Sequence, residues 1–343
     1  MNKLVLFFSA VLVVFFSQNV VAQLKNETVN LFSAYEQTKT DFSEIDNYVR
    51  TLKIGKNVSA NEMVELIIKK STTKLEKARA IYIWITENIA YDTSLKISTM
   101  ESGLKNRKGV CQAYSEIFQV FGEIAGLEVV TISGDSKQLF YKKTADLDKG
   151  GHAWNAFKSD DNKWILVETT WGAGYVNNNK FTRDPSDYWF VPSPQIFIFT
   201  HFPEEEKWQF LEKPVSRNEF LNIPPLQPKF INWGFNPNEL FFHYVTDKNK
   251  GFPEFFSINV NWKIIKMPVT DELKKGTTYE FVFEIFDNNE EVVIVINENE
   301  FLKPDKSANR LIFSVTPTKK GSLTVMIKQK NGKYAGVFKY LVK

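Results

Sequence analysis

The sequence has very little cysteine and histidine, the residues on which disulfide frameworks and zinc sites depend. Among 343 residues there is one cysteine, Cys111, and there are three histidines. A single cysteine cannot form an internal disulfide, so the fold has to be stabilised by packing alone. No second cysteine is available and no pair of histidines shares a predicted helix face, so the ligand spacing of a metal site is missing. We therefore expect no metal centre.

A phosphate-binding glycine loop is also missing, because the segment GAG at 172–174 is too short to form one. The sequence therefore predicts no cofactor. Neither sign of charge dominates: the sequence has 43 Lys and Arg residues and 40 Asp and Glu residues, which gives a formal net charge of +3. A nucleic-acid-binding domain carries a strongly basic stripe, so we expect no nucleic-acid partner.

Long apolar runs are missing after the N-terminal segment, so no later membrane span is expected. The N-terminus has one lysine, an apolar run over 4–16 and small residues at Val20 and Ala22. This order is typical of a secretory signal peptide, residues 1–22, and predicts a secreted or periplasmic protein without stable membrane insertion. An uncleaved membrane anchor is the alternative, but the run is shorter than the roughly 20 residues that span a bilayer. No cysteine lies near the predicted cleavage site before Gln23, which rules out lipid attachment at that site.

The rest of the chain has a helical first half and a β-rich second half. Abundant aromatic residues, 30 Phe, 12 Tyr and 8 Trp, supply a large core. Two capping-box patterns, Ser59 with Glu62 and Thr73 with Glu76, predict helix starts. Apolar residues near helical spacing predict two further helices. The four predicted helices cover about 28–50, 59–70, 73–92 and 110–126.

Strand patterns divide the remaining chain into a hairpin, a connector and a sandwich. Strands are predicted at 127–133, 152–159 and 163–171, the last two joined by a short polar turn. Seven prolines between 191 and 228 indicate a connecting region rather than a core element. From about Phe230, alternating strands without intervening helices indicate an all-β sandwich. The predicted organisation is a signal peptide (1–22), a core with N-terminal helices (23–191), a proline-rich connector (192–229) and a β-sandwich (230–343).

The single cysteine has two readings. A lone cysteine is most often a buried small hydrophobe without a chemical role. Cys111, however, follows a glycine at the predicted start of a helix, where unpaired N–H groups and the helix dipole stabilise a thiolate. The same N–H groups could hold a developing oxyanion.

The predicted hairpin brings a histidine and a carboxylate to the same face of the sheet. A three-residue turn at 160–162 pairs Ser159 with Lys163, and this register makes His152 and Glu168 diagonal neighbours. A carboxylate beside a histidine fixes the tautomer of the ring and supports its positive charge. Together with Cys111, these residues form the arrangement used for acyl transfer through a thioester. The alternative is a structural histidine and a solvated glutamate.

The other two histidines are weaker candidates for this chemistry. His201 lies in the proline-rich connector and His243 in the β-rich half. The strand pattern places no acidic residue opposite either of them. We therefore select His152 as the partner of Cys111.

Four motifs in a fixed order resemble the transglutaminase-like superfamily, most closely its kyphoscoliosis-type peptidase branch. They are WITENIAYD (84–92), GVCQAYSEIF (109–118), GHAWN (151–155) and LVETTWGAG (166–174). The segment at 197–220 is similar to the one that follows the core in that branch. The resemblance covers roughly residues 60–225, judged by motif spacing.

The resemblance implies an α+β fold class: a papain-like transglutaminase core, with helices packed on an antiparallel sheet, followed here by the all-β immunoglobulin-like sandwich. It implies that Cys111 is the nucleophile, that His152 is the base and that position 168 holds the third catalytic group. The family usually has aspartate there, whereas this chain has Glu168. Glutamate is one methylene longer, so it reaches the imidazole only with a shifted backbone or a bent side chain.

These observations lead to two hypotheses about function. The first is a secreted cysteine peptidase, amidase or transglutaminase-type acyltransferase that acts on protein or peptide substrates through Cys111, His152 and Glu168. The second is a non-catalytic binding or scaffold protein that keeps the cleft, which the replacement of aspartate by glutamate and the added sandwich favour. The choice between hydrolysis and cross-linking, the substrate and the oligomeric state remain open at this point.

Overall fold

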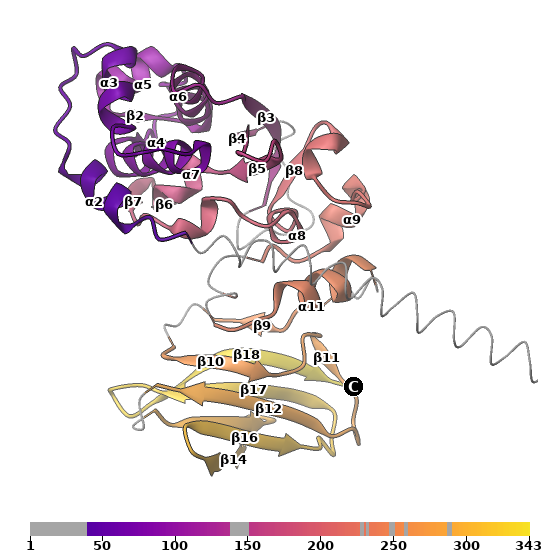
Figure 1. Ribbon diagram of the computed structural model, residues 1–343. Coiled ribbons are helices and arrows are strands. Elements are labelled where there is room, and N and C mark those ends of the chain that lie inside the picture. The colour runs from indigo at the N-terminus through magenta and orange to yellow at the C-terminus, as the bar shows by residue number, and fades with distance from the viewer. Residues whose placement is uncertain are drawn as a thin grey trace, which may run out of the picture. The chain divides into compact units, whose positions relative to one another are not determined.

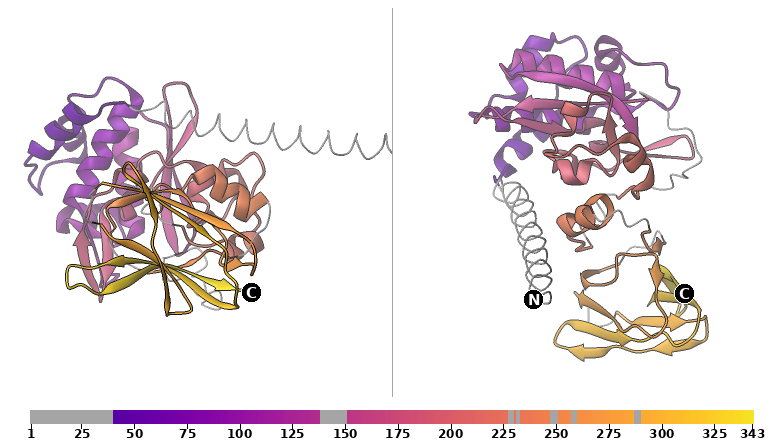
Figure 2. Two further views of the ribbon diagram at one scale, coloured as in Figure 1. Left: turned by 90° about the horizontal axis from the view of Figure 1, so that it is seen from below. Right: turned by 90° about the vertical axis from the view of Figure 1, so that its right-hand side faces the viewer.

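The computed structural model describes residues 40–137, 151–226, 230, 233–246, 251–256, 260–286 and 290–343. The predicted signal peptide and the first part of the helix predicted at 28–50 lie outside the described residues. The chain divides into two compact units (Figures 1 and 2). The first contains described residues 40–135, 151–194 and 203–210, and the second contains 136–137, 195–202 and described residues from 211 onward.

Two helices of the first unit begin at capping boxes. Capping boxes formed by Ser59 with Glu62 and by Thr73 with Glu76 start α3 and α4, as predicted. The helices are α2 (Ser43–Thr51), α3 (Ala60–Ile67), α4 (Lys74–Asn88), α5 (Met100–Asn106), α6 (Cys111–Ile124) and α7 (Thr169–Gly172), and η1 (Asp187–Trp189) and η2 (Glu206–Gln209) are 3-10 turns.

Helix α4 is the centre of this unit, because every residue from 78 to 86 is buried. The helix predicted to reach residue 92 ends at Asn88, where Ile89 adopts an extended conformation. The chain then forms β1 (Ala90–Tyr91), which pairs in parallel with β2 (Lys108–Gly109). This parallel pair directs the chain into the start of α6.

An antiparallel sheet packs against α6. Its strands β3 (Val129–Ser136), β4 (His152–Lys158) and β5 (Trp164–Val167) lie in the order β5-β4-β3. The hairpin register is the predicted one, with Asn155 opposite Val167. The strand predicted over 163–171 is too long, however: it ends at Val167 because the Glu168 side chain caps helix α7. A second hairpin, β6 (Gly174–Asn177) with β7 (Lys180–Arg183), follows α7.

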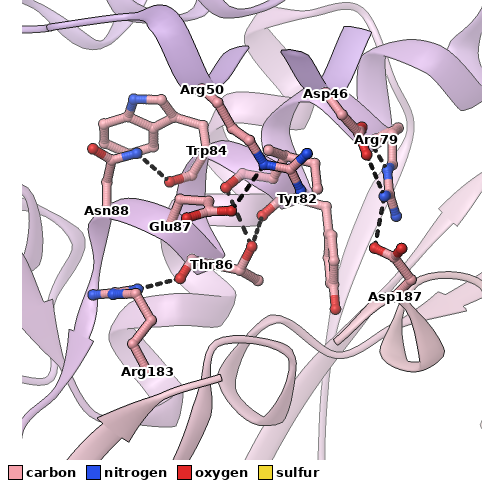
Figure 3. Close-up of polar contacts among 11 residues, drawn as sticks. Asp46, Arg50, Arg79, Tyr82, Trp84, Thr86, Glu87, Asn88, Arg183 and Asp187 are labelled. Atoms are coloured by element: carbon pink, nitrogen blue, oxygen red, sulfur yellow. Dashed lines mark hydrogen bonds and ion pairs between the residues drawn. The ribbon is translucent and has the colours of Figure 1, made fainter. Parts of the chain in front are cut away.

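A buried arginine ties α2 and η1 to the central helix (Figure 3). Arg79 of α4 donates two hydrogen bonds to the Asp46 carboxylate, at 2.9 and 2.6 Å, and one to Asp187 at 2.6 Å. Its side chain is only 4% exposed. The nearby pair of Arg50 and Glu87, with 3.1 Å between Nε and Oε1, is much more exposed.

The second unit contains a β-sandwich, drawn in orange to yellow in Figure 1. One sheet has the order β10-β12-β16-β15, and the other has the order β11-β18-β17-β13-β14 with β9 on β18. The strands are β9 (Glu254–Phe255), β10 (Trp262–Lys266), β11 (Glu272–Leu273), β12 (Tyr279–Ile285), β13 (Val292–Ile296), β14 (Glu300–Leu302), β15 (Asp305–Ser307), β16 (Arg310–Val315), β17 (Gly321–Lys328) and β18 (Tyr334–Val342). Alternate side chains fill the interior, where Phe281 and Tyr340 pack across the two sheets with ring centroids 5.7 Å apart.

The proline-rich stretch contains more structure than a connector was expected to have. It forms α8 (Pro194–Phe197), β8 (His201–Pro203) and α9 (Arg217–Asn222), and two further short elements, α11 (Pro237–Phe241) and the π-helix η3 (Phe242–Thr246), precede the strands. Phe199, Phe220 and Leu226 belong to the same hydrophobic cluster as the sandwich core. Part of the predicted connector therefore shares a core with the sandwich. That the predicted domains fold independently remains a prediction. Within the described ranges, no helix combines the length and apolar character needed to cross a bilayer.

Candidate active site

The thiol of Cys111 is placed by the parallel pair of β1 and β2. Val110 follows β2 in extended conformation and serves as the N-cap of α6 without a side-chain hydrogen bond. The first backbone bond into the helix runs from Tyr114 N–H to Val110 O, at 3.2 Å. The amides of Cys111, Gln112 and Ala113 precede that bond, as at any helix start. The half-buried thiol is thus beside backbone donors that can hold negative charge.

Gly109 allows this close approach of the strand to the helix. A Cβ atom at this position would lie 2.6 Å from the Cβ atom of Ala113, closer than real side chains pack. The glycine two residues before the cysteine therefore has a steric role: it lets β2 run against the first turn of α6.

The imidazole of His152 lies at the start of β4, where its side chain is 7% exposed. Two indoles flank the ring: the centroid of Trp171 is 5.8 Å away and that of Trp154 is 6.0 Å away. Indoles on both sides keep water from much of the ring. Trp171 was not identified as a site residue from the sequence. Its position three residues after Glu168, in the motif ETTWG, could have indicated that it lies near the site.

The carboxylate of Glu168 binds three hydrogen-bond donors. Its Oε2 is 2.7 Å from Nε2 of His152. Its Oε1 accepts from the backbone N–H groups of Thr170, at 2.7 Å, and Trp171, at 3.1 Å. The side chain is fully buried. The same carboxylate thus caps α7 and contacts the imidazole, so the longer glutamate side chain makes both interactions at this position.

The charge of His152 stabilises both of its neighbours, whereas the charge of Glu168 opposes the thiolate of Cys111. Burial by itself would raise the pKa of Cys111, but the hydrogen bond and charge of His152, together with the N–H of Ala153, lower it overall. Burial would likewise lower the pKa of His152, but the charge of Glu168 and the hydrogen bonds with Cys111 and Glu168 raise it above its usual range. Both shifts favour a thiolate beside an imidazolium. Glu168 contacts Nε2 of the ring.

The remaining two histidines each contact an aromatic ring. His201 is buried and stacks on Phe197 with ring centroids 4.1 Å apart, and its Nδ1 is 2.9 Å from Oγ1 of Thr200. His243 lies in η3 and contacts the ring of Tyr244.

Comparison with known proteins agrees with this geometry. Residues 61–169 match the model of the transglutaminase-like superfamily. The kyphoscoliosis peptidase of Mus musculus is 33% identical over 183 residues, which are 51% of this chain and 28% of that protein. The kyphoscoliosis peptidase of Homo sapiens is 32% identical over 204 residues, 56% of this chain and 30% of that protein.

The resemblance to the kyphoscoliosis-type branch is therefore confirmed, as is the mixed α+β class with a β-rich C-terminal region. The chain spans about three tenths of the length of these relatives. A solved structure described as a TGase aligns with 49% of this chain and 43% of its own, at 15% identity and a TM-score of 0.27. An alignment of that quality supports no further argument.

Proposed function

We propose that the protein is a cysteine-dependent acyl-transfer enzyme that acts on amide bonds of proteins or peptides. The observation that carries the proposal is the 2.7 Å contact of His152 Nε2 with Glu168 Oε2, on an imidazole whose interaction with Cys111 raises its pKa and lowers that of the thiol. In this proposal Cys111 is the nucleophile, His152 is the general base and acid, and Glu168 orients the ring.

The reaction takes two steps. The thiolate of Cys111 attacks the amide carbonyl carbon, and the C–N bond breaks as His152 gives its proton to the leaving nitrogen. Water or an amine then attacks the thioester carbon while the neutral His152 takes its proton, and the C–S bond breaks to restore the thiolate. Backbone N–H groups at the start of α6 stabilise the oxyanion in both steps.

Similarity to relatives named as peptidases favours water as the acceptor, and hence hydrolysis. The test is to incubate the purified chain with a mixture of unfolded proteins and a fluorescent primary amine, beside its Cys111→Ala variant. New amino termini that require Cys111 would support a peptidase, and amine incorporation would support a transferase. If neither product forms and the thiol reacts no faster than free cysteine, the chain is a binding protein that has kept the site.

The proposal includes export from the cytoplasm, because residues 1–22 have the charge, apolar run and small-residue order of a signal peptide. N-terminal sequencing of the protein from its native cell tests this part. A mature chain that starts at Gln23 is the expected result, whereas a chain that still starts at Met1 would contradict it.

A further inference from the structure

A short loop next to the nucleophile presents a large apolar side chain to solvent. Between β1 and α5, residues 92–97 form a turn in which the N–H of Leu95 bonds Asp92 O at 3.0 Å. Leu95 is 67% exposed. Its φ is 59°, in the left-handed region that a branched side chain normally avoids. An exposed leucine in an unfavourable backbone conformation needs an explanation, and functional sites are where such residues concentrate.

The loop is held rigidly by one buried carboxylate. Asp92 is 2% exposed, and its oxygens accept from Ser94 Oγ at 2.8 Å and from the N–H groups of Lys96 and Ile97 at 3.0 Å. The ammonium of Lys108 lies 3.4 Å away. Burial would raise the pKa of Asp92, but these hydrogen bonds hold it below its usual range. The conformation of Leu95 is thus imposed by its surroundings.

The first and last residues of the loop form hydrogen bonds with the two residues that precede the nucleophile. Asp92 N–H donates to Gly109 O at 2.9 Å, and Val110 N–H donates to Ile97 O at 2.8 Å. The two ends of the loop are therefore hydrogen-bonded to residues 109 and 110, which directly precede Cys111. A loop this short keeps its tip within about 10 Å of its base. The loop that carries Leu95 is consequently anchored beside the segment that leads into Cys111.

A second side chain from the same region approaches the thiol. Tyr91, the last residue of β1, is half-buried and pairs in register with Gly109. Burial raises the pKa of its phenol, and the negative charge of Cys111 raises it further, so the phenol and the thiol are electrostatically coupled. Tyr91 and the loop that carries Leu95 thus follow one another along the chain, and the backbone of both is bonded to the segment that leads into Cys111.

We infer that Leu95 is a specificity-determining residue, which contacts an apolar side chain adjacent to the amide that Cys111 attacks. The inference deepens the proposed function and rests on it. A rigid apolar contact at this position favours acyl donors with a leucine-like neighbour over donors with glycine. Burial of such a side chain corresponds to a preference of about 10- to 100-fold.

The test uses two peptide vinyl sulfones, which bind Cys111 covalently and so fix the register. They differ only in having leucine or glycine next to the residue that carries the electrophile. The rate of Cys111 modification is measured for the full chain, for Leu95→Asn, and for Leu66→Asn as a matched control, since Leu66 is a 42% exposed leucine on α3. Asparagine tolerates the left-handed conformation, so the loop is expected to keep its shape.

We expect the leucine probe to react at least about 10-fold faster than the glycine probe with the full chain and with Leu66→Asn, and the preference to fall to near unity in Leu95→Asn. Iodoacetamide carries no peptide side chain that could contact Leu95, so it should label Cys111 at the same rate in the full chain and in both variants. Equal rates for both probes in the full chain, or an unchanged preference in Leu95→Asn, would overturn the inference. The iodoacetamide rate reports separately on the activation of Cys111, so a failure of the proposed function is distinguished from a failure of this inference.

Discussion

In the second unit, polar and apolar side chains alternate along β12, β16 and β17, whereas the first unit places charged groups in its interior. Among the described residues after 210, no charged side chain is buried, although Lys137, also in the second unit, is; in the first unit Asp46, Arg79, Asp92 and Glu168 are buried. Each of these four makes several hydrogen bonds. The sandwich is therefore stabilised by apolar packing, and the first unit also by polar contacts that fix particular loops and helix ends.

The largest difference between the units should appear when the site itself is altered. Replacing His152 by alanine removes the general base and the partner of the thiolate, so acyl transfer is expected to fall by about 10³- to 10⁴-fold. Iodoacetamide labelling at neutral pH should slow as well, because an unpaired buried thiol keeps its proton. His243→Ala in the second unit is the control and should leave both rates unchanged. Labelling of His152→Ala at the original rate would remove the thiolate–imidazolium pair from the mechanism.

Breaking a buried polar contact should destabilise the first unit. Arg79→Met leaves the Asp46 carboxylate buried without its cation, and a buried pair broken on one side costs about 3–5 kcal/mol of unfolding free energy. Arg50→Met removes the exposed pair with Glu87 and should cost less than about 1 kcal/mol. Urea unfolding of the two variants gives the comparison. A similar, small loss in both would show that Arg79 is not needed to hold α2 on α4.

A core truncation gives the matching test in the sandwich. Phe283 is fully buried, and its replacement by alanine should cost about 3–5 kcal/mol of unfolding free energy. If the units fold independently, the labelling rate of Cys111 should not change while a sandwich-specific unfolding transition moves to lower denaturant. Loss of Cys111 reactivity together with the sandwich would show that the chain unfolds as one cooperative unit.

The contrast between the units also explains which features could be predicted from the sequence. Strands β12, β16, β17 and β18 fall within the segments 277–286, 310–317, 321–329 and 334–342, where the alternating pattern predicts strands, because apolar burial on one face determines the register. Strand β13 falls within the predicted segment 291–296, but all of its residues are buried. The hairpin register at the site was predictable for the same reason. It depends on turn length and strand spacing, and it is enough to bring His152 and Glu168 together.

The features that escaped prediction depend on a side chain that bonds a backbone several residues away. The predicted strand at 163–171 ends early because Glu168 caps α7, and no periodicity reveals that bond. The turn organised by Asp92 shows no pattern in a single sequence either. Short helices such as α11 are equally invisible, since a five-residue segment contains too little of the helical period.

The pH dependence of the site offers a finer test of its electrostatics. Because the pKa of Cys111 is lowered and that of His152 is raised, the ion pair exists between the two values. Labelling should therefore persist below the pKa of about 8.5 of a free thiol and disappear only as pH falls through the lowered pKa of Cys111. At pH 6 the labelling rate should therefore exceed that of free cysteine. A labelling curve that coincides with that of free cysteine would contradict the lowered pKa.

The smallest expected effect, and the sharpest test of the polar first unit, comes from shortening the acid. Glu168→Asp keeps the charge but withdraws the carboxylate by one methylene, so it cannot both cap α7 and reach Nε2 of His152 at 2.7 Å. We expect activity to fall by about 10-fold, from the less well oriented ring, and stability to fall by about 1 kcal/mol, from the weakened cap. Glu116→Asp, at another carboxylate that accepts a backbone N–H bond, is the matched control for stability. Higher activity in Glu168→Asp would mean that the family's usual aspartate suits this backbone better, and that the double hydrogen bonding of Glu168 mainly serves the fold.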